Sequence, residues 1–423
     1  MPRSLAQRLS AVAPSATLAM SARAAEMRAR GIDVFAFGVG EPDFEPPKHV
    51  LEAAKKAVDS GCSKYTAVTG IAPLKKAICE ATTRMRGWTP KPEEVCVTVG
   101  AKHALFNLAL ALFEPGDEVI IPAPYWVSYP EQVRIVGAKP VIVDTKEEEG
   151  WRMSPAALER ALTSKTKAII MCTPSNPTGA AYDAAHMRAI LEVVRKHDCW
   201  LIVDEIYAEL VYDGFEFASS AKLAPDLRDR MVIVDGVSKT YAMTGWRIGW
   251  SIAPAHLTKA LDTVQGQSTT NASAVAQYAA VAALEGKLDD LYAMRATFQK
   301  RRDVMVNGLN AIPGVSCRTP EGAFYAFADV RGLYGIPWDG AGAAGDRPMH
   351  SRVLATDEDV AFWLLDRAHV AAVPGGAFGA PGYVRFSYAV SEDRIRAGLA
   401  AFRRAVDDGW GDDRTTEVAA GGH

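Results

Sequence analysis

Short apolar runs of strand length alternate with helical stretches through the middle of this 423-residue chain. The predicted strands are residues 95–99, 118–121, 140–143, 168–172, 200–203 and 231–234, and the predicted helices include 102–113, 183–197 and 273–284. Strands buried on both faces read as continuous apolar runs, and strands that alternate with helices form βαβ units. The pattern therefore predicts an α/β fold, with a large domain whose mostly parallel central sheet is flanked by helices.

The pattern changes after about residue 287, where a long charged helix leads into a second region. The elements expected there are strands near 323–327 and 383–387 and helices at 357–369 and 392–406. Such a mixture predicts a smaller α+β domain. The length of the chain agrees with this division, because one ordinary core seldom serves more than about 300 residues.

Two segments lie outside these elements. Residues 335–347 are rich in Gly, Ala and Pro, so we expect a surface loop there, to which no role can be assigned. Residues 407–423 are polar and contain several glycines. Such composition buries too little apolar surface to fold alone, so we expect a disordered C-terminal tail.

Composition and charge restrict the class of partner. The chain has 47 basic and 50 acidic residues and a net charge of -3, which gives no attraction to nucleic acid or to an anionic membrane. No apolar run approaches the ~20 residues of a membrane span. The six cysteines form no C-x-x-C pair and no metal-ligand spacing, so we expect free thiols in a reducing cytoplasm and no metal site. The composition favours a protein that acts on small molecules.

Two charged residues, Asp204 and Lys239, each stand just beyond a predicted strand. Ligands of parallel sheets bind outside the carboxyl ends of the strands, so both residues are expected to face a crevice. Ser238 and Arg247 flank the lysine with a hydroxyl and a permanent cation, which suit a phosphate dianion. Taken alone, such an aspartate is most often a turn former and such a lysine a solvated charge.

Three further segments suit the same ligand. A strand turns through Gly100 into a helix, whose first N–H groups, at Ala101 and Lys102, can bind an anion. Asn176 lies in a proline-containing turn after a strand, and Trp126 could stack on a flat ring. Each of these could equally be an ordinary turn or a core aromatic. Together, a lysine for an aldehyde, an acid for a pyridinium nitrogen, phosphate donors and an aromatic face form the set that pyridoxal phosphate needs.

The sequence at residues 236–249, GVSKTYAMTGWRIG, resembles the cofactor-lysine signature of class I aminotransferases throughout its length. Further matching segments are residues 38–44, 64–65, 124–129, 175–179, 204–207 and 383–388. The chain thus resembles the pyridoxal-phosphate-dependent aminotransferases of fold type I, specifically the prokaryotic aspartate aminotransferase group. The resemblance implies a cytoplasmic homodimer with shared active sites and pyridoxal 5'-phosphate as its cofactor.

The resemblance also assigns roles to residues of this sequence. It implies that Lys239 binds the cofactor covalently and moves a proton, with Asp204 on the ring nitrogen and Tyr207 on the phenolic oxygen. The residues implied to bind the cofactor are Lys239, Asp204, Tyr207, Asn176, Trp126, Ala101, Lys102, Ser238, Arg247 and, from the other subunit, Tyr65. The residues implied to bind substrate are Gly40, Trp126, Asn176, Arg385, Thr17 and Lys102, with Arg385 on the α-carboxylate.

The N-terminus is basic and poor in acids, which is also typical of a transit peptide. However, residues 14–17 resemble a segment that belongs to the mature enzyme and closes over the site. We therefore expect residues 1–45 to join residues 291–406 in the small domain, and residues 46–290 to form the large cofactor-binding domain. Ala13 stands where relatives that also use prephenate or arogenate tend to carry a basic residue, which argues against prephenate activity.

The activity implied by the resemblance is a ping-pong transamination of L-aspartate and 2-oxoglutarate to oxaloacetate and L-glutamate. The preference for dicarboxylates depends on Lys102 and Thr17 as partners of the side-chain carboxylate. The alternatives are an aminotransferase for aromatic or other amino acids, including prephenate or arogenate, or another fold type I enzyme such as a lyase. A non-catalytic relative is a further alternative, but it would be expected to have lost Lys239 or Arg385.

Overall fold

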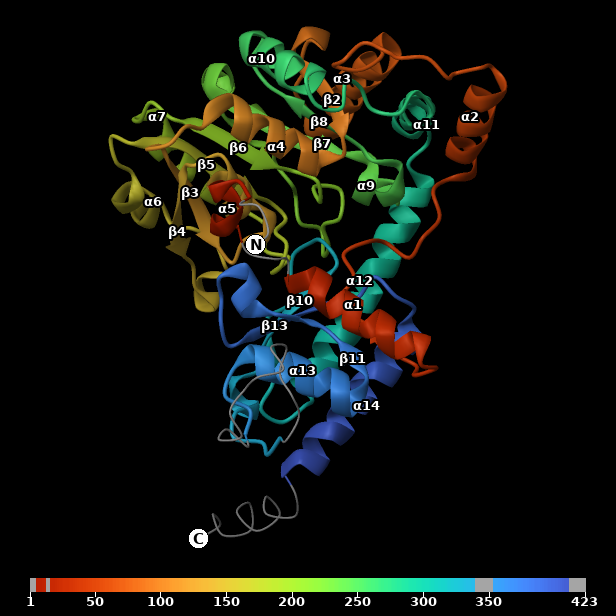
Figure 1. Cartoon of the computed structure of the whole chain (residues 1–423), viewed down its shortest axis with the longest axis vertical. Coiled ribbons are helices and arrows are strands. Elements are labelled where there is room, and N and C mark those ends of the chain that lie inside the picture. The colour runs from red at the N-terminus through yellow and green to blue at the C-terminus, as the bar shows by residue number, and fades with distance from the viewer. Residues whose placement is uncertain (1–4, 13–15, 339–352, 411–423) are drawn as a thin grey trace.

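The computed structural model describes residues 5–12, 16–338 and 353–410 of the chain, and its larger part is built on a seven-stranded sheet (Figure 1). The strands are β2 (Val95–Val99), β3 (Glu118–Ala123), β4 (Lys139–Asp144), β5 (Thr166–Cys172), β6 (Trp200–Asp204), β7 (Met231–Gly236) and β8 (Ile248–Ile252). Their order in the sheet is β2-β8-β7-β6-β5-β3-β4. All neighbours are parallel except β8, which is antiparallel to β2 and β7. The predicted mostly parallel sheet is confirmed, and β8 is a strand that the prediction missed.

Helices cover both faces of this sheet because successive strand residues point to opposite sides. The helices of this part are α2 (Lys48–Asp59), α3 (Ala72–Arg86), α4 (Ala101–Leu112), α5 (Ser128–Ile135), α6 (Pro155–Ala161), α7 (Ala184–Arg195), α8 (Ser220–Leu223), α9 (Val237–Thr240), α10 (Ala255–Gly266) and α11 (Ala274–Glu285). In β7, Val232 and Val234 belong to the core under α4, α5 and α10, whereas Met231 and Ile233 belong to the core under α3, α7 and α11.

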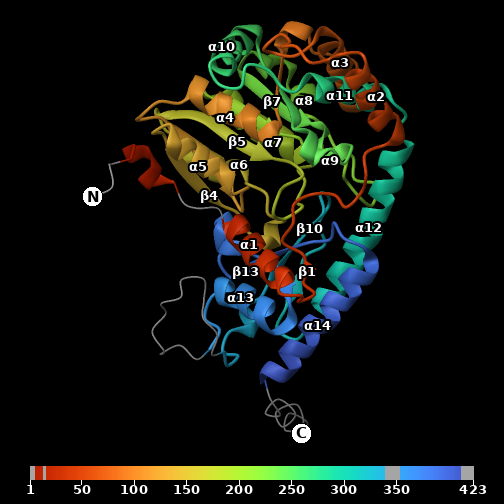
Figure 2. The same cartoon turned by 45° about the vertical axis from the view of Figure 1, so that its right-hand side comes forward.

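The smaller part lies below the sheet in Figure 1, and the long helix α12 (Asp289–Asn310) runs down one side from the larger part into it (Figure 2). Its strands are β1 (Phe35–Ala36), β9 (Ser316–Cys317), β10 (Tyr325–Asp329), β11 (Val370–Ala371), β12 (Val373–Pro374) and β13 (Tyr383–Ser387). Its helices are α1 (Ala16–Ala29), α13 (Asp357–Ala368) and α14 (Glu392–Trp410). Strands β12, β13, β10 and β9 form an antiparallel sheet, so this part is α+β as predicted.

Short 3-10 helices join several of these elements. They are η1 (Gln7–Ala11), η2 (Pro92–Glu94), η3 (Glu147–Glu149), η4 (Pro225–Arg230), η5 (Thr244–Trp246), η6 (Arg331–Leu333) and η7 (Gly375–Phe378). Within the described ranges, no helix combines the length and the apolar composition needed to cross a bilayer. All six cysteines are free thiols.

The N-terminal segment is joined to the C-terminal part by strand pairing. Strand β1 pairs in parallel with β11, so Phe35 lies beside Val370 and Ala36 beside Ala371. On this pairing we propose that residues 1–45 and 291–406 form one small domain and residues 46–290 the large one. Helix α14 extends to Trp410. The predicted disorder is therefore wrong for residues 407–410, which belong to the last turn of α14. The rest of the predicted tail and most of the predicted loop at 335–347 lie outside the described residues.

Candidate active site

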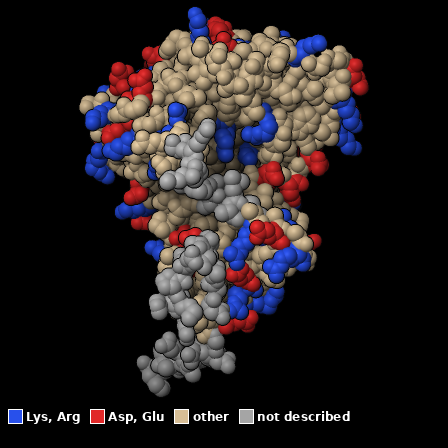
Figure 3. Space-filling view, viewed as in Figure 1, with Lys and Arg blue, Asp and Glu red and all other residues tan. Residues whose placement is uncertain are grey.

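The carboxyl ends of the central strands line a cavity of about 590 Å³, and residues of β10 and β13 line its opposite wall. In the space-filling view, basic side chains gather at the hollow between the upper and lower parts of the molecule (Figure 3). Eleven of the predicted site residues line this cavity: Gly40, Ala101, Lys102, Trp126, Asn176, Asp204, Tyr207, Ser238, Lys239, Arg247 and Arg385. A hollow of about 740 Å³ lies on the smaller part against Trp363 and Arg404, away from the strand ends, and none of the predicted residues lines it.

One predicted residue of the described side chains, Tyr65, does not line the cavity. The side chain of Tyr65 is 88% exposed on the surface of the chain, so its expected contact with a second subunit stays a prediction. Thr17 belongs to the first turn of α1, and its role in substrate binding also stays a prediction. Ala13 lies outside the described residues.

Lys239 lies on the short helix α9, which follows β7 at the carboxyl edge of the sheet. Its Nζ donates a hydrogen bond to the backbone oxygen of Gly40 over 2.6 Å. Burial lowers the pKa of Lys239 to about 8, and the nearby charge of Arg247 acts in the same direction, whereas Glu41 opposes it. A substantial fraction of this amine is therefore neutral near physiological pH, as a nucleophilic lysine requires.

Asp204 is the last residue of β6, and its carboxylate is almost completely buried. Its Oδ2 accepts a hydrogen bond from the Tyr129 hydroxyl over 2.7 Å, and its Oδ1 accepts one from the backbone N–H of Ile206 over 3.2 Å. Burial raises the pKa of Asp204 to about 6, while these hydrogen bonds and the Lys239 charge oppose that rise. The site thus holds a carboxylate, Asp204, that is mostly ionised at neutral pH, and an amine, Lys239, that is partly neutral there.

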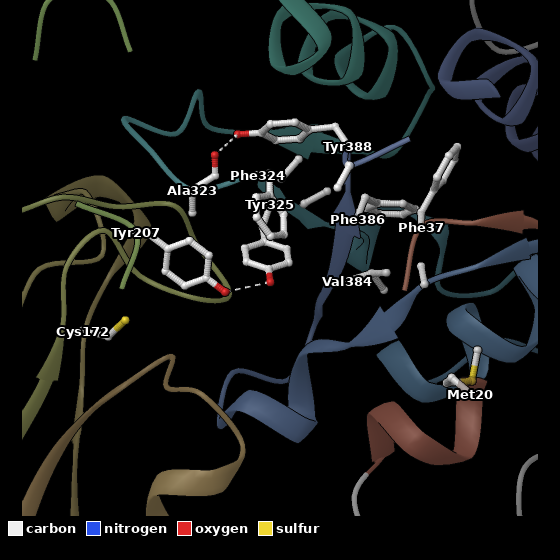
Figure 4. Packing of buried hydrophobic residues seen from close by; sticks show 14 of the residues in the cluster. Met20, Phe37, Cys172, Tyr207, Ala323, Phe324, Tyr325, Val384, Phe386 and Tyr388 are labelled. Atoms are coloured by element: carbon white, nitrogen blue, oxygen red, sulfur yellow. Dashed lines mark hydrogen bonds between the residues drawn. The ribbon is translucent and has the colours of Figure 1, made fainter. Parts of the chain in front are cut away.

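The hydroxyl groups of Tyr207 and Tyr325 lie 2.9 Å apart and point toward one another (Figure 4). Burial raises the pKa of Tyr207 well above its usual value, with Tyr325 contributing, so the phenol stays neutral and can donate a hydrogen bond. The guanidinium of Arg385 lies 4.5 Å from the centre of the Tyr325 ring. Tyr325 therefore contacts two of the predicted site residues, one on each side of the cavity.

Arg385 lies on β13 and is 2% exposed. It donates from Nη1 to Asn176 Oδ1 over 2.7 Å and from Nη2 to the backbone oxygen of Gly38 over 2.9 Å. Its Nε has no hydrogen-bond partner within the described part of the chain. A buried guanidinium with donors left over is suited to binding a carboxylate ligand.

The first turn of α4 forms one end of the cavity, and two glycines allow its neighbours to approach. A Cβ on Gly100, whose φ is 79°, would lie 2.5 Å from Arg247 Nη2, and a Cβ on Gly249 would collide with the backbone nitrogen of Ala101. The backbone N–H groups at a helix start, the hydroxyl of Ser238 and the guanidinium of Arg247 are all donors suited to an anion. This cradle fits a phosphate group.

An aromatic ring completes the cavity. Trp126 contacts Lys102, whose Nζ lies 4.9 Å from the centre of the indole ring, and packs edge-on against Tyr129, with ring centroids 5.4 Å apart. Burial lowers the pKa of Lys102, and the Arg247 charge acts in the same direction. A cation and a flat apolar face thus lie together on one wall, where they can bind a planar, negatively charged ligand.

Several cavity residues were not among the predicted ones, namely Val39, Glu41, Tyr129, Cys172, Ile206, Thr244 and Tyr325. Glu41 accepts a hydrogen bond from the Thr244 hydroxyl over 2.8 Å, which joins the N-terminal segment to the turn before Arg247. The sequence carried a signal for Tyr129, because this residue closes the matching motif at 124–129, but none for Tyr325.

Comparisons with known proteins agree with this geometry. Residues 32–402 match the family described as aminotransferase class I and II. An aspartate aminotransferase of Rhizobium meliloti is 46% identical over 95% of this chain and 96% of its own length, and an aspartate/prephenate aminotransferase of Cereibacter sphaeroides is 45% identical over 94% and 97%.

Solved structures give the same result. The crystal structure of the aspartate aminotransferase from Rhizobium meliloti superposes with a TM-score of 0.89 at 45% identity, over 96% of this chain and 99% of that chain. The aspartate aminotransferase from Thermus thermophilus with maleate gives a TM-score of 0.87 at 40% identity, over 96% and 100%. Because the family model matches most of the chain and relatives are up to 46% identical over 95% of it, this chain belongs to the class I and II aminotransferases.

Proposed function

We propose that the protein is a pyridoxal-phosphate-dependent aspartate aminotransferase, which transfers the amino group of L-aspartate to 2-oxoglutarate in a ping-pong reaction. The proposal is carried by one observation: Lys239, Asp204 and Arg385 line the same cavity. An amine, a carboxylate and a guanidinium around one hollow are the groups needed to bind an aldehyde cofactor and the carboxylate of an amino acid. The names of the similar proteins support the same activity.

The donor set of the cavity fits the cofactor. Ser238, Arg247 and the first N–H groups of α4 would hold its phosphate, Asp204 its ring nitrogen and Tyr207 its phenolic oxygen. When bound, pyridoxal phosphate supplies an electron sink that stabilises negative charge at the substrate α-carbon. Trp126 would cover one face of the ring and exclude water from it.

The residues of this chain would then perform two tasks. Lys239 Nζ would take a proton from the substrate α-carbon and hold it for delivery to the cofactor, and its lowered pKa of about 8 makes the neutral amine available for this transfer. Arg385 would bind the α-carboxylate through its guanidinium, in a position fixed by Asn176 and the backbone oxygen of Gly38. Both amino acid and oxo acid would use the same cavity in alternating half-reactions.

The preference for aspartate is supported by Lys102, whose partly buried ammonium lies in the same cavity. A dicarboxylate needs a second cation besides Arg385, and the Thermus thermophilus structure is described with maleate, which is a dicarboxylate. Thr17 is a further candidate partner of this second carboxylate. We also propose that the enzyme is a cytoplasmic homodimer, which is supported by six free thiols and by the exposed ring of Tyr65.

The test is a comparison of kcat/KM for aspartate, tyrosine and alanine with 2-oxoglutarate as acceptor. We expect aspartate to rank first, and a lower rank for aspartate would refute the specificity while leaving the reaction class intact. Lys102→Met keeps the backbone N–H but removes the charge, so it should lower kcat/KM about tenfold or more for aspartate and much less for alanine. An equal loss for both donors would contradict the assignment of Lys102.

A second acceptor, prephenate, is favoured by one observation. Two of the similar proteins, from Cereibacter sphaeroides and Nitrosomonas europaea, are named aspartate/prephenate aminotransferases at 45% and 44% identity. Rates with prephenate in place of 2-oxoglutarate would decide the matter. Aspartate consumption that depends on prephenate would support dual use, and its absence would exclude prephenate as an acceptor.

A further inference from the structure

The hydroxyl of Tyr129 and the carboxylate of Asp204 form a hydrogen bond inside the protein. Tyr129 lies in the first turn of α5, is 2% exposed and donates to Asp204 Oδ2 over 2.7 Å. The second oxygen of the carboxylate is held by the backbone N–H of Ile206. Each oxygen therefore has one fixed donor, which leaves Asp204 a single orientation toward the cavity that it lines.

A neutral donor in this position favours the charged form of the acid. Hydrogen bonds to an ionised carboxylate are roughly twice as strong as those between neutral groups. Burial raises the pKa of Tyr129 well above its usual value, with the Asp204 charge contributing, so the phenol remains protonated over the range in which the carboxyl titrates. The hydrogen bond thus opposes the effect of burial on Asp204.

Other ionisable groups also face Asp204. Lys239 on α9 favours the ionised carboxylate, whereas Asp235 at the end of β7 is a like charge. Cys172 at the end of β5 is a neutral thiol, since burial raises its pKa far above neutrality. Among these neighbours from α5, β5, β7 and α9, Tyr129 is the one that contacts the carboxylate by a side-chain hydrogen bond.

Tyr129 also contacts the aromatic wall of the cavity. Its ring packs edge-on against Trp126 at an interplanar angle of 81°. The same side chain therefore touches the acid proposed to hold the cofactor's ring nitrogen and the indole proposed to cover its face. Replacing the hydroxyl alone would leave the second contact in place, which allows the two roles to be separated.

We propose that Tyr129 is a positioning residue that keeps Asp204 ionised and oriented for the ring nitrogen of the cofactor. This inference rests on the proposed function. It predicts that loss of the hydroxyl weakens cofactor binding mostly at low pH, where Asp204 would otherwise take up a proton. A role in packing alone would weaken binding equally at every pH.

The test uses Tyr129→Phe, which removes one oxygen atom and keeps the ring. Apo-protein is titrated with pyridoxal phosphate at pH 6, 7.5 and 9, and affinity is read from quenching of tryptophan fluorescence. We expect affinity within about twofold of wild type at pH 9 and roughly fivefold weaker at pH 6, since a rise of one pKa unit from about 6 lowers the ionised fraction of Asp204 at pH 6 from about one half to about one tenth. Tyr129→His places a ring donor there that gains a positive charge at low pH, so it should bind cofactor more tightly than Tyr129→Phe at pH 6. It serves as the second variant if Tyr129→Phe does not fold, and a fall in its affinity at pH 6 as large as that expected for Tyr129→Phe would overturn the inference.

Two controls complete the experiment. Tyr212 is a buried tyrosine whose hydroxyl donates to the backbone oxygen of Ala323 and does not line the cavity, so Tyr212→Phe should bind cofactor like wild type. In the Asp204→Asn background, Tyr129→Phe should have no further pH-dependent effect, because the titrating group is gone.

The possible failures are distinguishable. If wild-type protein shows no binding of pyridoxal phosphate, the proposed function falls and this inference falls with it. If wild type binds but Tyr129→Phe matches it at all three pH values, or loses the same factor at each, the inference on Tyr129 alone is overturned. A pH-dependent effect that persists in the Asp204→Asn background would overturn that inference as well.

Discussion

Arg385 on β13 donates a hydrogen bond to Asn176 Oδ1, and this bond joins the small antiparallel sheet to the turn that follows strand β5. The two residues are separated by 209 positions in the chain. Because the amide oxygen uses one donor of the guanidinium and Gly38 another, the plane of the Arg385 fork is fixed before any substrate arrives. Fixed donors lose less entropy on binding than flexible ones.

Arg385→Ala should therefore weaken binding of the amino acid. Charge-assisted hydrogen bonds contribute about 1.5–3 kcal/mol, which corresponds to a rise in KM of about 10- to 150-fold. Arg385→Lys keeps the charge but not the bidentate geometry, so its KM should lie between that of wild type and that of Arg385→Ala. Steady-state kinetics with aspartate measure both, and an unchanged KM in Arg385→Ala would contradict the role.

Lys239→Ala should remove transamination, with a fall in kcat of at least about 10³-fold, because the nucleophile and the proton carrier are lost together. The variant should keep its fold, since helix α9 and strand β7 are held by other contacts. Borohydride reduction followed by peptide mass spectrometry should find the cofactor attached to Lys239 in wild type. Lys259, an exposed lysine of α10, offers a matched control, and Lys259→Ala should behave as wild type.

The pKa of Lys239 gives a prediction on pH. A protonated amine cannot attack the cofactor's aldehyde, so attachment should be slow below about pH 8 and should accelerate as pH rises through that value. Stopped-flow absorbance of apo-protein mixed with pyridoxal phosphate measures this midpoint. A midpoint near 10.5, the ordinary value for lysine, would show that burial does not act on the amine as inferred.

Glu41 provides a check on the cause of that pKa. Its negative charge favours the protonated amine of Lys239 and opposes the effect of burial. Glu41→Gln removes the charge and keeps the shape of the side chain, so the midpoint should move to lower pH. A move to higher pH would contradict the sign of this interaction.

Much of the larger part was predictable from the sequence because parallel strands are buried on both faces. Strand β5, for example, has six of its seven residues buried, and its apolar run stands out from polar neighbours. Strand β8 was missed because Gly249 and Ser251 interrupt its apolar residues. Position 249 requires a glycine because a Cβ there would collide with the backbone of Ala101 in the folded chain. No local sequence pattern reveals this contact.

The candidate site was predictable to the extent that it lies on strand ends. Sheet polarity places Asp204 and Lys239 at one edge, so two separate motifs could be assigned to one ligand. Tyr129 and Tyr325 could not be found in this way. A buried tyrosine is common, and its function here depends on which group its hydroxyl meets, 75 residues away for Tyr129 and 118 for Tyr325.

Behind the site, Arg86 is a buried cation surrounded by three carboxylates. At the end of α3 it bonds Glu209, lies 3.0 Å from Asp235 Oδ2 and 3.5 Å from Glu205 Oε2. Glu205 adjoins Asp204, and Asp235 lies near the end of the strand that leads to Lys239. Arg86→Met should therefore lower the free energy of unfolding by about 3–5 kcal/mol, as removal of one partner from a buried ion pair does.

The loss of stability in Arg86→Met should depend on pH, in a direction set by the pKa values of Glu205 and Asp235. Burial raises the pKa of Glu205 to about 7 and that of Asp235 to about 6, while Arg86 opposes both shifts. Without Arg86 these folded-state pKa values rise further above the unfolded ones, so the folded state binds more protons and stability falls as pH increases. Urea unfolding should show a larger loss at pH 8 than at pH 5. Arg195→Met, which breaks an exposed pair with Asp226, should stay close to wild type at both; an equal loss in the two variants would show that the buried cation has no special role.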